Sequence, residues 1–489
     1  MNTIKSASTR RELLKRASIA ATAAALPSSL YAGRAHAQPR ADGKLLFVVA
    51  AAGGGSIIDS FLPIVDTGNL PIVSYPSAIV ATSGNFKCVH SPVPIDLDGF
   101  RITGHIKPFL DRHRDDVAVL TQESTSVNHV VAQKRSLTGA GIHGGRTILE
   151  AMAVRHGQGL MLPNVNMCES GYLEHGDDVT VPDSARATAV ADAMLFPFAT
   201  DGFRGIKNAP ARSLLERARQ VRKHLDRNSV AGHTFRDAPI QKQWLDARER
   251  LVPQMEAADL ITKLTMVANV PGSLPLTEFD LESSPDGPAV RAQFPSLLSD
   301  PLEAQAALAF LLTRHRVSCA VAISPSFNPL LDGGLKNTPL AFDFSHSNHT
   351  LTQYAMWSRI LKVTDGLITL LKNQLWNDAD PAQGSMWDHS VVYIASDFGR
   401  DKTRPPGSLQ FGSGHHLNNG NVVVSPLLNG GRVYGDVDRT TGLTYGFNRS
   451  TGAPETSTLM HEGDVYSVIA QALDIDFAGR LDIPTMVRV

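Results

Sequence analysis

Short, nearly continuous apolar runs recur along the chain, and most of them end in glycine or polar residues. A strand that is buried on both faces of a parallel sheet has this continuous pattern, whereas a strand with one solvent-facing side alternates. The runs therefore predict buried, mostly parallel strands. The clearest of them are Lys44–Ala52, Asp116–Leu120, Ser318–Ile323 and Val391–Ile394.

Segments with helical periodicity separate these strands, as in an α/β protein whose central sheet carries helices on both faces. They are Gly104–His113, Val130–Leu137, Gly144–His156, Leu302–Leu312, Thr352–Leu375 and Val465–Leu473. Two further segments, Ser213–Asp226 and Gln241–Val267, are charged as well as periodic. They predict a helical insertion at about residues 200–300 within one α/β domain that spans residues 38–489.

Polar side chains follow two of the predicted strands. Asp59 comes just after the glycine-rich turn that ends the first strand, and Asp397 and Arg400 follow Val391–Ile394. Because ligands bind at the carboxyl ends of strands in open α/β sheets, we expect a site at this edge. The turn is followed by neither a phosphate-loop lysine nor the glycine spacing of a dinucleotide fingerprint, so the sequence predicts neither nucleotide site.

Carboxylate and imidazole side chains also gather in two later segments. Asp343 and His346 are close enough in sequence to meet on one turn, and His349 follows them. His415 and His416 come after a loop rich in glycine and proline. Such donors suit a divalent cation, and the competing interpretation is a pair of solvated polar loops.

The amino terminus has the features of an export signal. Arg10 and Arg11 form a twin-arginine pair, an alanine-rich apolar segment follows at Ala17–Leu30, and Ala35-His36-Ala37 offers a cleavage site. We therefore expect residues 1–37 to be a twin-arginine signal peptide, read by the twin-arginine translocase. A periplasmic or secreted protein without a stable membrane span is predicted.

The composition bears on core size, on nucleic acid binding and on the role of the cysteines. The chain has 489 residues, 43% of them hydrophobic, which is enough for a large core. The formal net charge of −1 gives no electrostatic reason to expect a nucleic acid partner. Cys88, Cys168 and Cys319 lack metal-site or disulfide-framework spacing, and inert core thiols are expected.

The order of these features resembles the alkaline phosphatase superfamily, and most closely its bacterial exported, sulfatase-like proteins of unknown function. The similar segments run from about Leu45 to Ile475 and include GGGSIIDSFLP, NHVVAQKRSLTG, LMLPNV, FDFSH, SDFGR and GHHLNNGNVVV. The resemblance implies an alkaline-phosphatase-like α/β sandwich. It also implies divalent metal, one or two ions of zinc, manganese, magnesium or calcium.

By that resemblance, Asp59 and Asp397 would hold one ion. Asp343, His346 and one of His415 or His416 would hold the second ion. FDFSH has one residue more than the family's segment, which leaves His346 and His349 as alternatives.

His129 marks a departure from the family. It stands nine residues before Thr138, where phosphatases and sulfatases of the superfamily have a Ser, Thr or Cys nucleophile. Either His129 is a metal ligand, or it attacks the substrate, or metal-bound water attacks; otherwise the chain has lost catalysis. Ser124, Thr125 and Ser126 are hydroxyls nearby, but at the wrong offset.

The sequence thus predicts a periplasmic, metal-dependent hydrolase of phosphate or sulfate esters. Its substrate would be a small anionic ester, with His129 as a catalytic residue and Arg400 orienting the anion by its bidentate fork. The alternative is a non-catalytic exported relative that binds an anionic ligand, a glycan or a partner protein.

Overall fold

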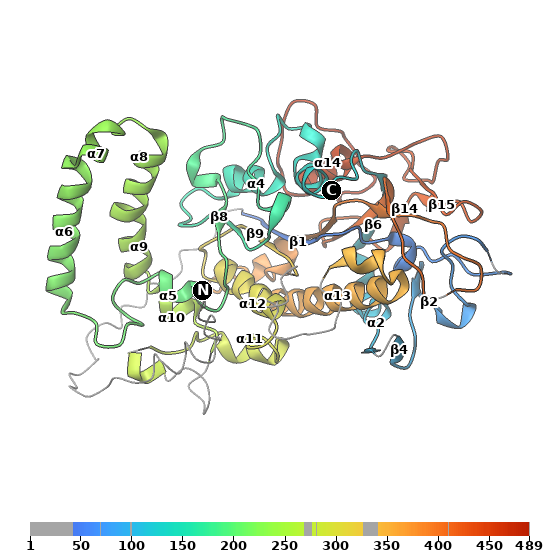
Figure 1. Ribbon diagram of the computed structural model, residues 1–489, viewed down its shortest axis with the longest axis horizontal. Coiled ribbons are helices and arrows are strands. Elements are labelled where there is room, and N and C mark those ends of the chain that lie inside the picture. Colours follow the sequence, from blue (N-terminus) through green and yellow to red (C-terminus); the bar gives the residue numbers. More distant parts are fainter. Residues whose placement is uncertain are drawn as a thin grey trace, which may run out of the picture. The chain divides into compact units, whose positions relative to one another are not determined.

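A computed structural model of the protein describes residues 43–68, 70–97, 100–267, 276–279, 281–325, 341–408 and 410–488. The predicted signal peptide, residues 1–37, lies outside the described residues. The chain divides into a larger unit, residues 39–193 with 289–489, and a smaller unit whose described residues fall within 194–288. Figure 1 shows the elements of both units.

An eight-stranded sheet forms the centre of the larger unit, in the order β14-β6-β13-β10-β1-β9-β7-β8. Its strands are β1 Leu45–Ala51, β6 Val117–Glu123, β7 Asn164–Asn166, β8 Thr188–Ala189, β9 Ala320–Ile323, β10 Ser390–Ser396, β13 Asn418–Val424 and β14 Arg432–Tyr434. All neighbours in this sheet are parallel except where β13 pairs with β10 and β6. The predicted α/β class with a mostly parallel sheet is therefore confirmed.

The apolar runs became the innermost strands. Every residue of β1 and β10 is buried, and the two strands pair in parallel along their full length. Burial on both faces explains why their sequences are continuous rather than alternating. The carboxyl ends of these two strands consequently lie at one edge of the sheet.

Strand β13 runs against its neighbours, which matters for the site. Asn418, its first residue, pairs with Glu123, the last residue of β6. The chain that enters β13 therefore arrives at the same edge where β1, β6 and β10 end. The apolar residues Val422–Val424 form the end of this strand, and nothing in their pattern indicates its direction.

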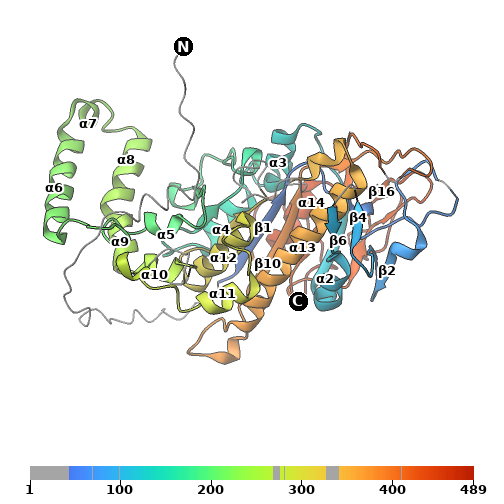
Figure 2. The same ribbon diagram turned by 60° about the horizontal axis from the view of Figure 1, so that its bottom comes forward.

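Helices cover both faces of this sheet (Figures 1 and 2). On one face lie α2 Ile106–His113, α12 Pro301–Arg314 and α13 His349–Asn373, which contact one another or the sheet. On the other lie α3 His129–Thr138, α4 Ile148–His156 and α14 Glu462–Ala472. This is the expected three-layer arrangement.

The smaller unit is helical. It contains α5 Phe196–Ala199, α6 Arg212–Asn228, α7 Val230–Thr234, α8 Pro239–Asp246, α9 Val252–Ala257 and α10 Leu260–Leu264. The prediction of one continuous helix over Gln241–Val267 is wrong. It is interrupted by a π-helical turn at Ala247–Leu251 and by Asp259, whose φ of 52° is left-handed.

Among the described residues of both units, no helix combines the length and the apolar character that a bilayer crossing requires. Cys88, Cys168 and Cys319 are buried and form no disulfide, as expected of core thiols.

Candidate metal centre

The candidate site lies where strands of the central sheet end. Gly53 follows β1, Asp397 follows β10, and His129 lies beyond β6 at the start of α3. His415 belongs to the short strand β12 His415–His416, just before β13. The sheet topology therefore delivers carboxylate and imidazole groups from distant parts of the sequence to one edge.

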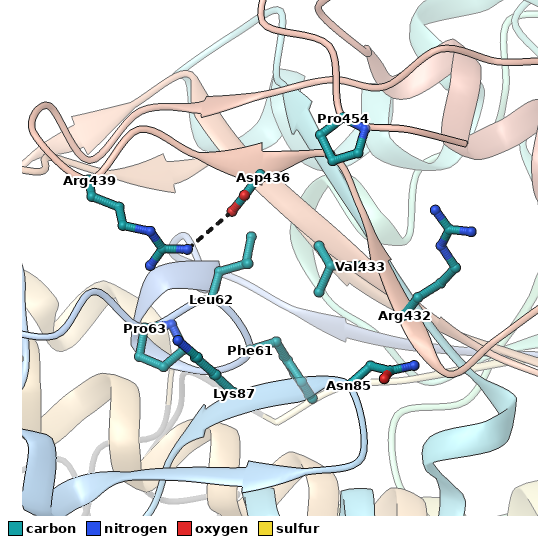
Figure 3. A pocket seen from close by; sticks show the side chains of 11 residues that line it. Phe61, Leu62, Pro63, Asn85, Lys87, Arg432, Val433, Asp436, Arg439 and Pro454 are labelled. Atoms are coloured by element: carbon teal, nitrogen blue, oxygen red, sulfur yellow. Dashed lines mark ion pairs between the residues drawn. The ribbon is translucent and has the colours of Figure 1, made fainter. Parts of the chain in front are cut away.

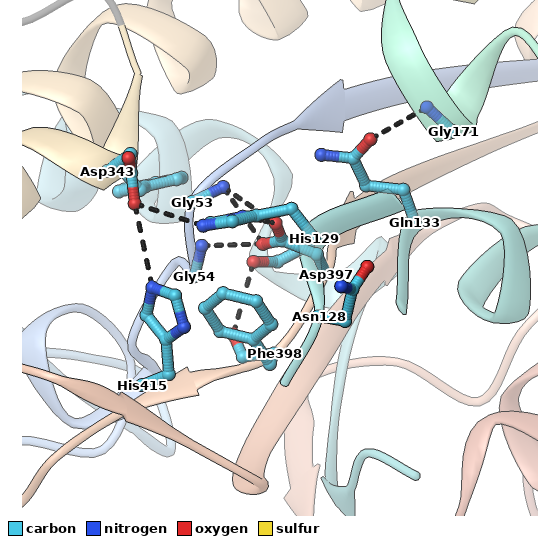
Figure 4. A network of polar contacts seen from close by, with 12 residues as sticks. Gly53, Gly54, Asn128, His129, Gln133, Gly171, Asp343, Asp397, Phe398 and His415 are labelled. Carbon is cyan, nitrogen blue, oxygen red and sulfur yellow. Dashed lines mark hydrogen bonds and ion pairs between the residues drawn. The ribbon is translucent and has the colours of Figure 1, made fainter. Parts of the chain in front are cut away.

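Asp397 is a buried acceptor that ties three segments together (Figure 4). Its carboxylate accepts the backbone N–H groups of Gly53 at 2.9 Å and Gly54 at 2.6 Å. It also accepts a hydrogen bond from Nδ1 of His129, at 2.8 Å. A buried carboxylate needs such donors, and here they fix the orientation of the His129 ring.

His129 opens helix α3, and the Asn128 side chain caps that helix by accepting the N–H of Val131 at 3.2 Å. Nε2 of His129 lies 3.3 Å from Oδ1 of Asp343. The hydrogen bonds to Asp343 and Asp397 raise the pKa of His129 to about 9. The ring thus lies between two carboxylates, in a place where positive charge is favoured.

Asp343 lies on the turn Phe342–His346 and is held against the end of β1. The N–H of Phe342 donates to the carbonyl of Ala52 at 3.0 Å. Arg400 donates from Nη2 to Oδ1 of Asp343 at 3.0 Å. The contact with His129, followed by that with Arg400, keeps the pKa of Asp343 well below its usual range, so the carboxylate is ionised.

Gly53 makes this approach possible. A Cβ atom on Gly53 would stand 2.1 Å from the backbone nitrogen of Asp343, and the φ of Gly53 is +98°. Only glycine combines that conformation with so close a neighbour.

Two more imidazoles complete the cluster. Nε2 of His346 and Nε2 of His415 are 2.8 Å apart, and they lie 3.4 Å and 3.8 Å from Oδ1 of Asp343. Nδ1 of His415 faces the carbonyl oxygen of Val127 at 3.2 Å. Burial, followed by Arg400, lowers the pKa of both imidazoles, which favours the neutral form that binds metal.

These donors fit a metal ion. Ligand atoms of His129, Asp343 and His415 all lie within 4.8 Å of one another. Nε2 of His346 lies beside them, 2.8 Å from Nε2 of His415 and 3.3 Å from Nη1 of Arg400. Ligand atoms bound to zinc at about 2.0–2.1 Å in a tetrahedron lie roughly 3.3 Å apart, close to the 3.3 Å and 3.8 Å that separate Oδ1 of Asp343 from Nε2 of His129 and of His415. Nδ1 of His129 and Nδ1 of His415 each face an oxygen atom, so both rings direct Nε2 toward Asp343.

Asp59 is engaged elsewhere. Tyr75 donates its hydroxyl to Oδ1, and Nε2 of His349 lies 3.0 Å from Oδ2. Burial opposes ionisation of Asp59, but His349 together with the hydroxyls of Ser56 and Tyr75 outweighs it and lowers the pKa. Asp59 is therefore paired with His349 and not with Asp397. The prediction that Asp59 and Asp397 share an ion is not supported by these contacts.

The sequence left two choices open, His346 or His349 and His415 or His416, and the positions of the side chains distinguish them. His346 joins the cluster, whereas His349 is buried against Asp59. His415 joins it, whereas Nδ1 of His416 accepts the N–H of Asn418 at 3.0 Å. Successive residues of a strand point to opposite sides, which separates His415 from His416.

Arg400 is buried, and both terminal nitrogens of its guanidinium donate to the protein, whereas its Nε has no partner among the described contacts. Arg400 donates to the carbonyls of Gly53, Phe342 and Ser413 as well as to Asp343. These contacts position the Asp343 turn. The predicted contact of Arg400 with a substrate anion draws no support from them.

Sequence reasoning missed the backbone part of the site: the N–H groups of Gly53 and Gly54, and the carbonyl of Val127. The glycine-rich turn was the available signal for the first two. The nearby hydroxyl of Thr125 contacts Glu462 at 3.0 Å. Within the described contacts, no hydroxyl or thiol reaches His129, Asp343 or His415.

No known family model matches the chain, and no curated protein matches it significantly. Among solved structures, similarity is found to Ps i-CgsB in complex with k-i-k-neocarrahexaose, with 10% identity and a TM-score of 0.27. The structure of Ps i-CgsB alone gives 11% identity and a TM-score of 0.26. Both matches cover 91% of this chain and 75% of the other. TM-scores this low do not establish a common fold, so the chain's own geometry carries the functional interpretation.

Proposed function

We propose that the protein is a metal-dependent hydrolase of phosphate or sulfate esters, related to the exported, sulfatase-like members of the alkaline phosphatase superfamily. The observation that carries this proposal is the convergence of His129, Asp343, His346 and His415 at the carboxyl edge of the sheet. Three of the segments that resemble the family, NHVVAQKRSLTG, FDFSH and GHHLNNGNVVV, supply these four residues. Asp397 and Arg400 support the cluster from behind.

Zinc is the ion that these donors suit best, because the two imidazole nitrogens of His129 and His415 and the carboxylate of Asp343 leave the fourth tetrahedral position open, as a catalytic zinc requires. We propose a single ion here. A second ion between Asp59 and Asp397 would have to displace Tyr75 and His349 from one carboxylate, and His129 and two backbone N–H groups from the other.

The residues around the ion have distinct roles in this proposal. Asp397 holds the His129 ring by Nδ1, and Arg400 holds Asp343, so that the donors are preorganised. The ion, when bound, would polarise the ester and favour attack by water. Since the nucleophile position holds His129 and the Thr125 hydroxyl faces Glu462, water rather than a side-chain hydroxyl is the expected attacking group.

The test uses the purified chain, stripped with chelator and reloaded with zinc, manganese, magnesium or calcium in turn. Elemental analysis gives the bound metal, and a panel of aryl phosphate and sulfate esters gives turnover. We expect one metal ion and ester hydrolysis in the wild type, and loss of both in His415→Ala. His416→Ala is the matched control and should retain both, because His416 lies outside the cluster. Equal metal content in the two variants would reject the proposed centre.

The non-catalytic alternative is favoured by one observation: His129 already lies between Asp397 and Asp343, as an ion network without metal would place it. A protein that binds metal but hydrolyses no ester in the panel would support a binding role. A protein that binds no metal would support a purely structural network.

We also propose export by the twin-arginine translocase to the periplasm or the medium, on the sequence of residues 1–37. Replacing Arg10 and Arg11 by lysine should keep the protein in the cytoplasm, as cell fractionation would show. Export of this variant at the wild-type level would remove the proposal.

A further inference from the structure

A hollow of about 460 Å³ in the larger unit shares no residue with the metal centre. Its walls come from distant parts of the chain: residues 61–63 after the turn Ile57–Asp59, the hairpin of β2 Val80–Ser83 and β3 Phe86–Val89, and the region of β14 and β15 Asp436–Val437. Figure 3 shows Arg439 and Asp436 on one side, with Leu62, Pro63 and Lys87 opposite. The volume lies in the range of small-molecule sites.

Cationic groups outnumber anionic ones in this hollow. Lys87, Arg432 and Arg439 line it together with one acid, Asp436. Lys87 makes no side-chain hydrogen bond or ion pair among the described contacts. Arg439 lies 3.6 Å from Asp436, an exposed pair too long for a strong hydrogen bond, so its guanidinium retains donors. The hollow therefore favours an anion.

One of these cations is held in place. Arg432 donates from Nη2 to the carbonyl of Gly452 at 2.8 Å, and its guanidinium lies over the ring of Tyr434, 4.6 Å from the ring centroid. A guanidinium fixed in this way loses less entropy when it binds a ligand. The binding geometry is thus partly formed in advance.

The rest of the lining of the hollow favours an organic molecule over an inorganic anion. Phe61, Leu62, Pro63 and Val433 provide apolar surface. The amide of Asn85 donates to the carbonyl of Gly431 at 3.2 Å, which leaves its oxygen to accept from a hydroxyl. Apolar surface, a hydroxyl acceptor and several cations match a compact ring that carries hydroxyls and an acidic group.

From this combination we infer that the hollow is a binding site for a small organic anion of the acidic-sugar type. The site is independent of the metal centre and of the proposed hydrolysis. Its specificity comes from cations on two separate chain segments, Lys87 on one and Arg432 with Arg439 on the other.

Calorimetric titration of the full chain with D-glucuronate tests the inference, with glucose as the neutral probe and inorganic sulfate as the bare anion. We expect glucuronate to bind more tightly than either. Arg439→Gln and Lys87→Gln should each weaken it by about tenfold, the effect of one lost charge contact. Asp436→Asn should tighten it several-fold, because it removes the competing carboxylate.

Two controls separate this site from other causes. Arg217→Gln removes an exposed arginine of α6 and should leave binding unchanged. His415→Ala should also bind glucuronate normally, which distinguishes this site from the metal centre. The inference is overturned if glucuronate does not bind, if it binds no better than glucose, or if Arg439→Gln and Asp436→Asn shift the affinity in the same direction.

Discussion

At the scale of single residues, the candidate centre depends on which atom of each side chain is hydrogen-bonded to a neighbour. Asp397 accepts a hydrogen bond from Nδ1 of His129 and thereby directs Nε2 of that ring toward Asp343. Asp343 is the shared neighbour of His129, His346, His415 and Arg400. Asp397, a carboxylate outside the group of His129, Asp343 and His415, can therefore matter as much as a ligand.

We predict that Asp397→Asn weakens zinc binding by about 10–100-fold, the usual effect of losing a carboxylate behind a ligating histidine. The amide can still accept from Gly53 or Gly54, so the fold should persist. Competition titration with a zinc chelator measures the affinity, and circular dichroism checks the fold. An unchanged zinc affinity would show that Asp397 does not orient His129.

Lys402 offers a separate prediction, away from the cluster. It is buried and donates from Nζ to the carbonyl of Asn418 at 3.0 Å. Burial lowers its pKa to about 8 from the usual 10.5, although Asp59 opposes the shift. The folded state therefore disfavours the protonated amine, at a cost that is complete below pH 8 and disappears as the pH rises toward 10.5.

The stability of the wild type relative to Lys402→Met should accordingly rise between pH 8 and pH 10.5, by an amount on the order of 3 kcal/mol. Urea unfolding of both proteins at several pH values measures this difference. If this difference stays constant or falls across the range, folding does not lower the pKa of Lys402.

At the scale of elements, two features place the histidines. The reversed direction of β13 brings His415 to the edge where β6 and β10 end. The N-terminus of α3 presents His129, and the Asn128 cap fixes where that helix begins. Neither histidine would reach Asp343 if its element were shifted by a residue or two.

Asn128→Ala should destabilise the larger unit by about 1 kcal/mol, the usual effect of losing a helix cap. It should also weaken metal binding, because His129 is the first residue of α3. Chemical unfolding and metal titration give the two values. As a comparison, Asn228→Ala changes an exposed residue at the end of α6 and should leave metal affinity unaltered.

Gly53→Ala should be more damaging. The new Cβ atom would clash with the backbone of Asp343 and would require a left-handed conformation, which alone costs roughly 1–3 kcal/mol. We expect lower stability and loss of the metal site, since the turn that carries Asp343 must move. Gly414→Ala provides the control, because no atom lies within 4 Å of the position that its Cβ would take. Wild-type metal affinity in Gly53→Ala would contradict the described approach.

At the scale of the whole molecule, the centre joins segments that are far apart in the sequence. Its donors lie beyond β6, on the turn before α13 and on β12, so the site exists only when the larger unit is folded. Binding of a metal to the folded state alone must therefore stabilise that state.

Saturating zinc should raise the melting temperature of the chelator-treated protein. At a free concentration of roughly 100 times Kd, the gain is about 3 kcal/mol. Calorimetry with and without zinc measures the shift. His415→Ala should abolish it and His416→Ala should retain it; equal shifts in both variants would place the stabilising ion elsewhere.

Much of this molecule followed from the sequence alone. Continuous apolar runs specified β1, β6, β9 and β10, because burial on both faces requires such runs. The polar residues after two of those runs, Asp59 after the first and Asp397 with Arg400 after the last, predicted a site at one edge of the sheet. Asp343, His346 and His415 were identified as possible donors because carboxylate and imidazole side chains gather in their two segments.

Only the tertiary structure decided how the donors are grouped. Asp59 pairs with His349, and Asp397 orients His129, because close approaches of separate backbone segments set these distances. His415 and His416 are adjacent in sequence, and only the side to which each points separates them. Spacing along a chain determines burial and secondary structure, but the partners of a buried charge depend on which turns pack against it.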